Sequence, residues 1–499
     1  MYILSFRDMK KKIYILGLSV LLACSACEDW LTIQPETTVA AETLFKTDVG
    51  ITQGLNGAYY TAMSIYAPIS YFGGSSFVEY MANTYYCDPE MKGDDYYFSI
   101  HTYEQSDSQN NVNEWCFTGL YKVIANLNSM LSEMAKNVEK LTPNIYKICR
   151  GEAYALRACC HLDILRLYGP VPSAADASKT YVPYVRVNDV EDYTYHTFNQ
   201  FMDYVQMDLD SAEMFLQTVE PVLTQTFEAT NSTSNIWPYR KSRCNYYAVL
   251  ALQARAALWR GDKEKALRYA KLVKEAKNED GTSKVRLTTP NDNMSDYTVT
   301  DKTHYSEHLF GIKNETYDVN SFSDPFSRKV CYNKEDFIIN LYGEDYKNDL
   351  RYKNWWNISG KWEWVGDWQT GHSVWVTDGK YYITKYNDFT TNNTSAPHNF
   401  PIIRLPEMYF IIMECGTLTE ANAAYEEYCN ARGITYKPLT EDDRQERVIL
   451  ESIREYVAEG QNFFTYKRNN VKNMYGAITT SSEDQYIMPL PEAEYADVK

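Results

Sequence analysis

The chain has 499 residues, a formal net charge of −17 and a hydrophobic content of 44%, which is typical of a soluble globular protein. The acidic balance argues against a nucleic acid partner, because neutralising phosphates requires clustered Lys and Arg. Tyrosine is the outlier. The 44 Tyr and 10 Trp exceed what a core requires, and a ring with one polar group suits a wet recognition surface.

The N-terminus has the pattern of an export signal. Three lysines at 10–12 precede an apolar run over 13–23, which is too short to span a bilayer and has the length of a secretory signal core. We therefore predict a signal peptide of the lipoprotein type over residues 1–26.

Two cysteines compete as the lipidated first residue of the mature chain. Leu21-Leu22-Ala23 favours cleavage before Cys24, whereas the acidic pair Glu28-Asp29 favours Cys27. We predict lipidation of Cys27, with Cys24 as the alternative, and a chain held at the membrane by its acyl groups. A plainly secreted protein with neither cysteine modified is the remaining interpretation.

Residues 75–105 form a long segment rich in tyrosine and carboxylates. Aromatic rings stack on the apolar face of a sugar, and carboxylates bind its hydroxyls, so this mixture suits glycan contact. An equally acceptable interpretation is that the tyrosines brace a loop against the helices. The candidate ligand-binding residues of this segment are Tyr85, Tyr86, Asp88, Tyr96 and Tyr97.

Apolar residues at helical spacing indicate three pairs of helices. In the most regular pair, residues 245–276, the pattern breaks at Gly261-Asp262 and then resumes. Such a pair cannot bury its own apolar face, which predicts stacked, degenerate tetratricopeptide-like repeats. An ordinary helical domain whose alanines pack tightly is the alternative. The other pairs are 120–134 with 151–169, and 406–416 with 420–433.

Catalytic and metal-binding motifs are missing. There is no G-x-S-x-G or H-E-x-x-H, and no C-x-x-C follows Cys27. His304 and His308 flank Glu307 at a spacing that would suit a metal, but no third ligand is evident, so we expect a solvated surface pair. The sequence therefore predicts a protein that is not an enzyme, with no catalytic residues, no metal and no cofactor.

Residues 354–376 hold six of the 10 tryptophans. Alternation before the Gly366-Asp367 turn predicts a small β-hairpin with Trp362 and Trp364 on one face, a paired platform suited to a sugar. Because indoles are more often buried than exposed, a core role is the alternative for each. The candidate ligand-binding residues here are Trp355, Trp362, Trp364 and Trp368.

Several of these segments together resemble the SusD/RagB family of outer-membrane, nutrient-binding lipoproteins, nearly end to end. No single motif is decisive, but their order and spacing are specific. The segments that carry the resemblance are WCFTGLYKVIANLNSML (115–131), GEAYALRACCHLDILRLYGPVP (151–172), IIRLPEMYFIIMECG (402–416), REYVAEGQNFFTYKR (454–468) and YIMPLPEAEY (486–495).

The resemblance implies a mainly α fold, the SusD-like α–α superhelix, with four tetratricopeptide-like pairs as a spine and long irregular insertions that carry the ligand. It implies one SusD-like domain over 27–499, with an N-terminal part over 27–240 and a C-terminal part over 241–499. It also implies a lipid anchor in the outer membrane, facing the cell exterior, and a SusC-type TonB-dependent transporter on which the spine packs.

The function implied is capture of an oligosaccharide and its delivery to that transporter. An oligopeptide carrier is the first alternative, since peptide capture would use backbone hydrogen bonds and tolerate varied side chains. A structural scaffold, whose repeats hold other proteins and bind no small ligand, is the second.

Overall fold

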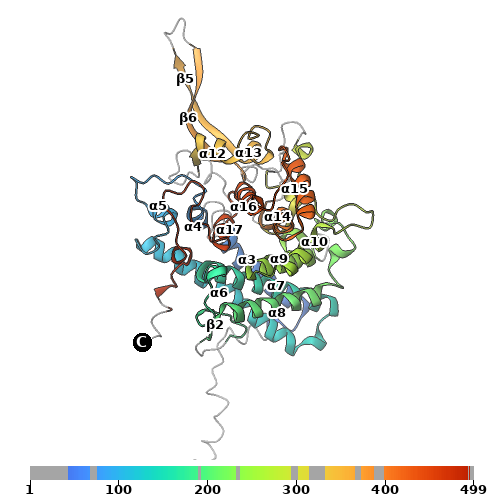
Figure 1. Ribbon diagram of the computed structural model, residues 1–499. Coiled ribbons are helices and arrows are strands. Elements are labelled where there is room, and N and C mark those ends of the chain that lie inside the picture. The colour runs from blue at the N-terminus through green and yellow to red at the C-terminus, as the bar shows by residue number, and fades with distance from the viewer. Residues whose placement is uncertain are drawn as a thin grey trace, which may run out of the picture.

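The computed structural model describes residues 43–67, 76–188, 193–231, 237–293, 302–313, 332–365, 372–386, 398–492 and 494. The predicted signal peptide, with Cys24 and Cys27, lies outside these residues. The described chain is mostly helical with a few small sheets, which confirms the predicted mainly α fold with insertions (Figure 1). Among the described residues, no helix has both the length and the hydropathy needed to cross a bilayer.

The helices fall into an N-terminal and a C-terminal group. The first group comprises α3 (Asp48–Tyr66), α4 (Phe77–Met81), α5 (Asp94–Ser99), α6 (Asp107–Lys136), α7 (Pro143–Tyr168), α8 (Phe198–Leu216), α9 (Tyr246–Arg260) and α10 (Lys263–Lys274). The second comprises α12 (Glu335–Tyr342), α13 (Leu350–Trp355), α14 (Leu405–Cys415), α15 (Leu418–Arg432), α16 (Arg444–Glu455) and α17 (Asn462–Arg468).

A continuous stack of helices forms the spine of the molecule. Each helix from α6 to α10 packs on the next, and α10 then packs on α14, which packs on α15 (Figure 1). The alanines of α9 are fully buried and allow its neighbours to approach closely, as at Ala248, Ala251 and Ala254. All three predicted helix pairs are present, as α6–α7, α9–α10 and α14–α15.

The turn between α9 and α10 lies where the sequence predicted it. Gly261 ends α9 in the left-handed region at φ +89°, which glycine adopts at little cost. Asp262 then caps α10, since its side chain accepts a hydrogen bond of 3.0 Å from the Lys265 backbone N–H.

Within the described residues, seven strands form three small antiparallel sheets. They are β1 (Thr180–Pro183) with β2 (Tyr195–Thr197), β3 (His308–Lys313) with β7 (Asn399–Arg404), and a sheet of order β4 (Tyr332–Lys334), β6 (His372–Ile383), β5 (Trp356–Val365). Strands β5 and β6 project from the helical body as a hairpin (Figure 1). This confirms the predicted hairpin, in which Trp362 lies opposite Trp375 and Trp364 opposite Ser373. The predicted Gly366-Asp367 turn lies outside the described residues.

A buried charge cluster joins the C-terminal helices to the base of this hairpin. The cations and carboxylates are almost equal in number, and their side chains are 4% exposed or less. Arg404 precedes α14 and pairs with Glu307 and Glu455, each at 2.7 Å. The cluster consists of Arg351, Lys385, Arg404, Arg432, Glu307, Asp349, Glu451, Glu455 and Glu459.

Candidate ligand-binding site

The two aromatic insertions lie beside each other. Strand β4 pairs with β6 of the hairpin, and it also contacts the tyrosine-rich segment. The Asn333 side-chain amide of β4 donates to the Thr84 carbonyl at 3.1 Å. The Lys334 ammonium lies 4.0 Å from the centroid of the Tyr86 ring. One surface, here called the tyrosine–hairpin face, therefore combines both segments that the sequence singled out.

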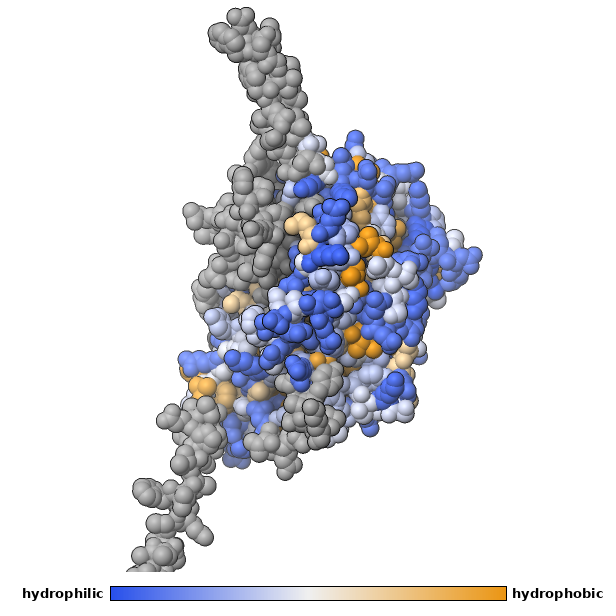
Figure 2. Space-filling view, turned by 90° about the vertical axis from the view of Figure 1, so that its left-hand side faces the viewer, coloured by the Kyte–Doolittle hydropathy of each residue, from blue (hydrophilic) through white to orange (hydrophobic). Residues whose placement is uncertain are grey.

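Four of the candidate residues in the tyrosine segment keep part of their surface in solvent. Tyr86 and Asp88 follow α4, while Tyr96 and Tyr97 lie on α5, with ring centroids 5.7 Å apart in an edge arrangement. Partly exposed rings beside a carboxylate can stack on a sugar and accept its hydroxyl hydrogens. Figure 2 shows the side of the molecule that carries α4 and α5; its described surface is mostly hydrophilic, with small separate hydrophobic patches.

Two other candidates are buried. Tyr85 is 2% exposed and packs edge-on against Tyr80, with ring centroids 5.6 Å apart. Trp355 is fully buried; its indole N–H donates to the Lys302 carbonyl at 2.7 Å, and the Lys385 ammonium lies 3.7 Å from a ring centroid. In this structure both residues pack the base of the insertions, the core role that the sequence left open.

The structure describes the other three candidate tryptophans only in part. Trp362 and Trp364 stand two positions apart on β5, which puts them on the same side of a strand. Their side chains, and the whole of Trp368, lie outside what the structure describes. Their contact with a ligand stays a prediction.

Asn333 and Lys334 could not be predicted as site residues from the sequence. They follow Thr84 and Tyr86 by about 250 positions, and the Asn333–Thr84 hydrogen bond spans 249. Neither residue belongs to a motif, and no local pattern indicates which strand would meet the tyrosine segment.

The predicted surface pair of histidines is wrong. His304 and His308 are both fully buried, and burial lowers the pKa of each well below its usual value, so both are neutral. His308 bonds the Thr303 carbonyl at 2.9 Å and the Asn399 side chain at 2.9 Å. The sequence suggested a surface because histidines beside a glutamate are usually solvated, but Asn354 and Asn399, far along the chain, contact these buried rings.

Among the described residues, three buried side chains have metal-ligating atoms close enough together to suggest a metal site. Ligand atoms of His304, Glu307 and Glu455 all lie within 4.8 Å of one another. Both carboxylates, however, are already bound to the guanidinium groups of Arg404 and Arg432, at 2.7 to 3.0 Å. Two fixed cations beside these carboxylates disfavour a third, so this group stabilises the fold.

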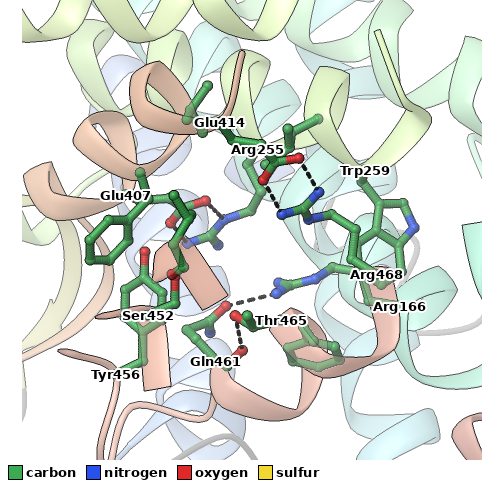
Figure 3. Close-up of a pocket in the computed structure, with 15 residues that line it drawn as sticks. Arg166, Arg255, Trp259, Glu407, Glu414, Ser452, Tyr456, Gln461, Thr465 and Arg468 are labelled. Atoms are coloured by element: carbon green, nitrogen blue, oxygen red, sulfur yellow. Dashed lines mark hydrogen bonds and ion pairs between the residues drawn. The ribbon is translucent and has the colours of Figure 1, made fainter. Parts of the chain in front are cut away.

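A small cavity lies among α7, α9, α14, α16 and α17 (Figure 3). Its volume is about 60 Å³, which has room for a few water molecules but not for a sugar ring. Arg255 forms a bidentate pair with Glu407, and Arg468 with Glu414. These ion pairs join α14 to α9 and to α17, so the cavity is structural.

Known proteins share this architecture. Residues 29–233 match the SusD-like family described as "Starch-binding associating with outer membrane". No curated protein sequence matches the chain. Among solved structures, a SusD superfamily protein from Bacteroides thetaiotaomicron VPI-5482 aligns with a TM-score of 0.67 and 19% identity, over 90% of this chain and 97% of that one.

Two further structures align over similar lengths. A SusD-like protein from Bacteroides fragilis NCTC 9343 has a TM-score of 0.62 and 16% identity, over 91% of this chain and 96% of that one. A laminarin-binding SusD-like protein has a TM-score of 0.58 and 15% identity, over 89% and 96%. Residues 29–233 thus match the SusD-like family in sequence, and the described chain has the fold of SusD-like proteins.

Proposed function

We propose that the protein captures an oligosaccharide on the tyrosine–hairpin face and passes it to a SusC-type TonB-dependent transporter. The observation that carries this proposal is the contact between the two aromatic insertions, through Asn333 with Thr84 and Lys334 with Tyr86. The family's description as starch-binding and a laminarin-binding relative of the same fold support a glycan as the ligand.

The chemistry of capture needs no covalent step. The rings of Tyr86, Tyr96 and Tyr97 would stack on sugar faces, while Asp88 accepts hydroxyl hydrogens and Lys334 donates to hydroxyl oxygens. An open site of this kind binds each sugar unit weakly and gains from high local concentration at a transporter mouth. The proposed role is thus a carrier and not an enzyme.

The proposed location is the outer surface of the outer membrane. A lipid on Cys27, or on Cys24, would anchor a chain whose family is described as associating with the outer membrane. The mass of the mature N-terminal peptide distinguishes the two cysteines and also an unmodified chain. The division into parts over 27–240 and 241–499 stays a prediction.

An oligopeptide is the main alternative ligand. Strand β4 lies at the edge of its sheet and beside the tyrosine segment, so an extended peptide could add to it by backbone hydrogen bonds. A peptide bound in this way would tolerate loss of single rings, whereas a glycan would not. If the protein is instead a scaffold without a small ligand, it should bind neither glycans nor peptides.

The test is binding of the ectodomain, starting at Glu28, to polysaccharides, oligosaccharides and mixed peptides, with product analysis. We expect saturable glycan binding without cleavage, lost in the double variant Y96A/Y97A. Tyr60→Ala is the matched control, because Tyr60 is 73% exposed on α3, outside the tyrosine–hairpin face. Binding of peptides alone, cleavage of the glycan, or equal loss in the control would refute the proposal.

A further inference from the structure

A second, larger cleft lies on the spine. It has a volume of about 1060 Å³ and is bounded by the C-terminal half of α6, by α7 and α8, and by residues 184–188. In Figure 1, α6, α8 and β2 lie at the end of the molecule away from the β5–β6 hairpin, so this cleft is separate from the tyrosine–hairpin face. Its volume is that of sites which hold small ligands.

Arg150 of α7 is held in place in this cleft. Its guanidinium donates to the Tyr146 hydroxyl at 2.7 Å and to the Tyr154 hydroxyl at 3.0 Å. It also lies 5.4 to 5.5 Å from the ring centroids of Tyr146, Tyr154 and Phe215. Phenol and ring contacts orient the guanidinium fork without neutralising its charge.

The carboxylates of the cleft are already bound elsewhere. Asp208 pairs with Arg157 through two bonds of 2.7 Å, and Glu133 pairs with Lys136 at 2.6 Å. Arg186 lies over the Tyr204 ring, 4.4 Å from its centroid. Within the part of the chain that the structure describes, no carboxylate lies within 4 Å of Arg150 or Arg186. Among the described residues, these two guanidiniums of one cleft thus have no carboxylate partner, in a chain whose net charge is −17.

The rest of the lining favours a hydroxyl-rich ligand. The rings of Tyr154 and Tyr204 line the cleft, and hydroxyl groups come from Ser129 and Ser132. Aliphatic side chains are a minority of the lining. Rings, hydroxyls and guanidiniums together match a sugar with an acidic group.

We propose that the cleft between α6, α7 and α8 is a second binding site, which takes a sugar unit bearing a carboxylate or sulfate group. Arg150 would bind the acidic group through paired N–H donors, and Arg186 would supply a second positive charge. The site does not depend on the tyrosine–hairpin face and goes beyond the proposed capture of a glycan there.

Calorimetric titration of the ectodomain tests the proposal, with tetragalacturonate, a sulfated heparin tetrasaccharide, neutral maltotetraose and tetraglutamate as probes. We expect at least one acidic saccharide to bind and the neutral one to bind at least tenfold more weakly. Arg150→Gln should weaken acidic saccharide binding tenfold or more. Arg268→Gln is the matched control, because Arg268 also stacks on a tyrosine, at 4.2 Å from the Tyr269 centroid, but on α10.

A second variant protects the test against loss of folding. Ser132→Trp places a bulky ring at an exposed position of the cleft wall and should block the site while the melting temperature is preserved. Y96A/Y97A should leave acidic saccharide binding intact, which separates this site from the tyrosine–hairpin face. Three results would overturn the proposal: no binding of either acidic saccharide, unchanged binding in both cleft variants, or equal binding of tetraglutamate.

The chain itself could compete for the cleft. Asp189, Glu191 and Asp192 follow Asn188 in sequence and lie outside the described residues. Acidic saccharide binding that occurs only in D189N/E191Q/D192N would mean that these carboxylates neutralise the arginines, and it would also overturn the proposal.

Discussion

The guanidinium of Arg404 lies 2.7 Å from the carboxylate of Glu455, and neither side chain has any exposed surface. Both residues belong to motifs that carry the resemblance to the family, 402–416 and 454–468. Arg255 and Glu407 form a similar pair between α9 and α14. The charged residues of these motifs thus form ion pairs inside the protein, so the motifs specify the fold.

Removal of Arg404 should strongly destabilise the protein. Arg404→Met would leave Glu307, Glu455 and Glu459 buried with one cation fewer, which costs about 3–5 kcal/mol of unfolding free energy. Urea unfolding measures the change. Arg286→Ala is the control, because Arg286 pairs with Asp292 but is 54% exposed, and its loss should cost less than about 1 kcal/mol. Similar losses in the two variants would contradict the structural role of the cluster.

Glu79 should make stability depend on pH. It is fully buried on α4, accepts a hydrogen bond from the Gly460 backbone N–H, and burial raises its pKa from 4.5 to about 7. Below pH 4.5 the carboxyl is protonated in both states. Between pH 4.5 and 7 the unfolded chain loses the proton while the folded chain keeps it, so folding is progressively destabilised, by up to about 3 kcal/mol.

Glu79→Gln isolates this effect. The stability of the variant relative to the natural protein should rise from pH 4 to pH 8, when both are unfolded in urea at each pH. A constant difference over that range would show that Glu79 ionises equally easily in both states.

Glycine should be required at the α9–α10 turn and not within α3. Gly261 has φ +89° with open space around it, so Gly261→Ala costs about 1 kcal/mol through backbone strain alone. Gly57 lies inside α3 and also faces open space, so Gly57→Ala should stabilise by about 0.5–1 kcal/mol. Thermal unfolding distinguishes the two signs, and equal effects would rule out the backbone explanation.

Substitution of Trp355 should affect stability, whereas substitution of Tyr97 should affect glycan binding. Trp355→Ala removes a fully buried indole and should cost about 3–5 kcal/mol. Tyr97→Ala changes a partly exposed ring, so stability should fall by less than about 1 kcal/mol while glycan affinity drops about tenfold. Calorimetric titration and urea unfolding on the same samples give both values. If Trp355→Ala kept its stability but lost glycan binding, Trp355 would be a ligand-binding residue and not a core residue.

Local signals explain why the spine was predictable. Helical spacing, the break at Gly261 and the cap at Asp262 all act within a few residues, and the structure has the helices there. The candidate site was predictable only by composition. The exposure of each tyrosine and the contact between Lys334 and Tyr86 depend on residues some 250 positions apart. No periodic pattern in the sequence indicates such contacts. The burial of His304 and His308 has the same origin, because their partners include residues far along the chain.

At the base of the β5–β6 hairpin, the Thr384 N–H donates to the Trp355 carbonyl at 2.8 Å. The chain thus leaves the helical body and returns to it at neighbouring positions. Because the entropy of closing a loop grows only with the logarithm of its length, doubling such an excursion costs about 0.6 kcal/mol. The projecting strands can therefore be lengthened, shortened or exchanged during evolution at little cost to folding, so new ligand preferences can arise there while the spine stays the same.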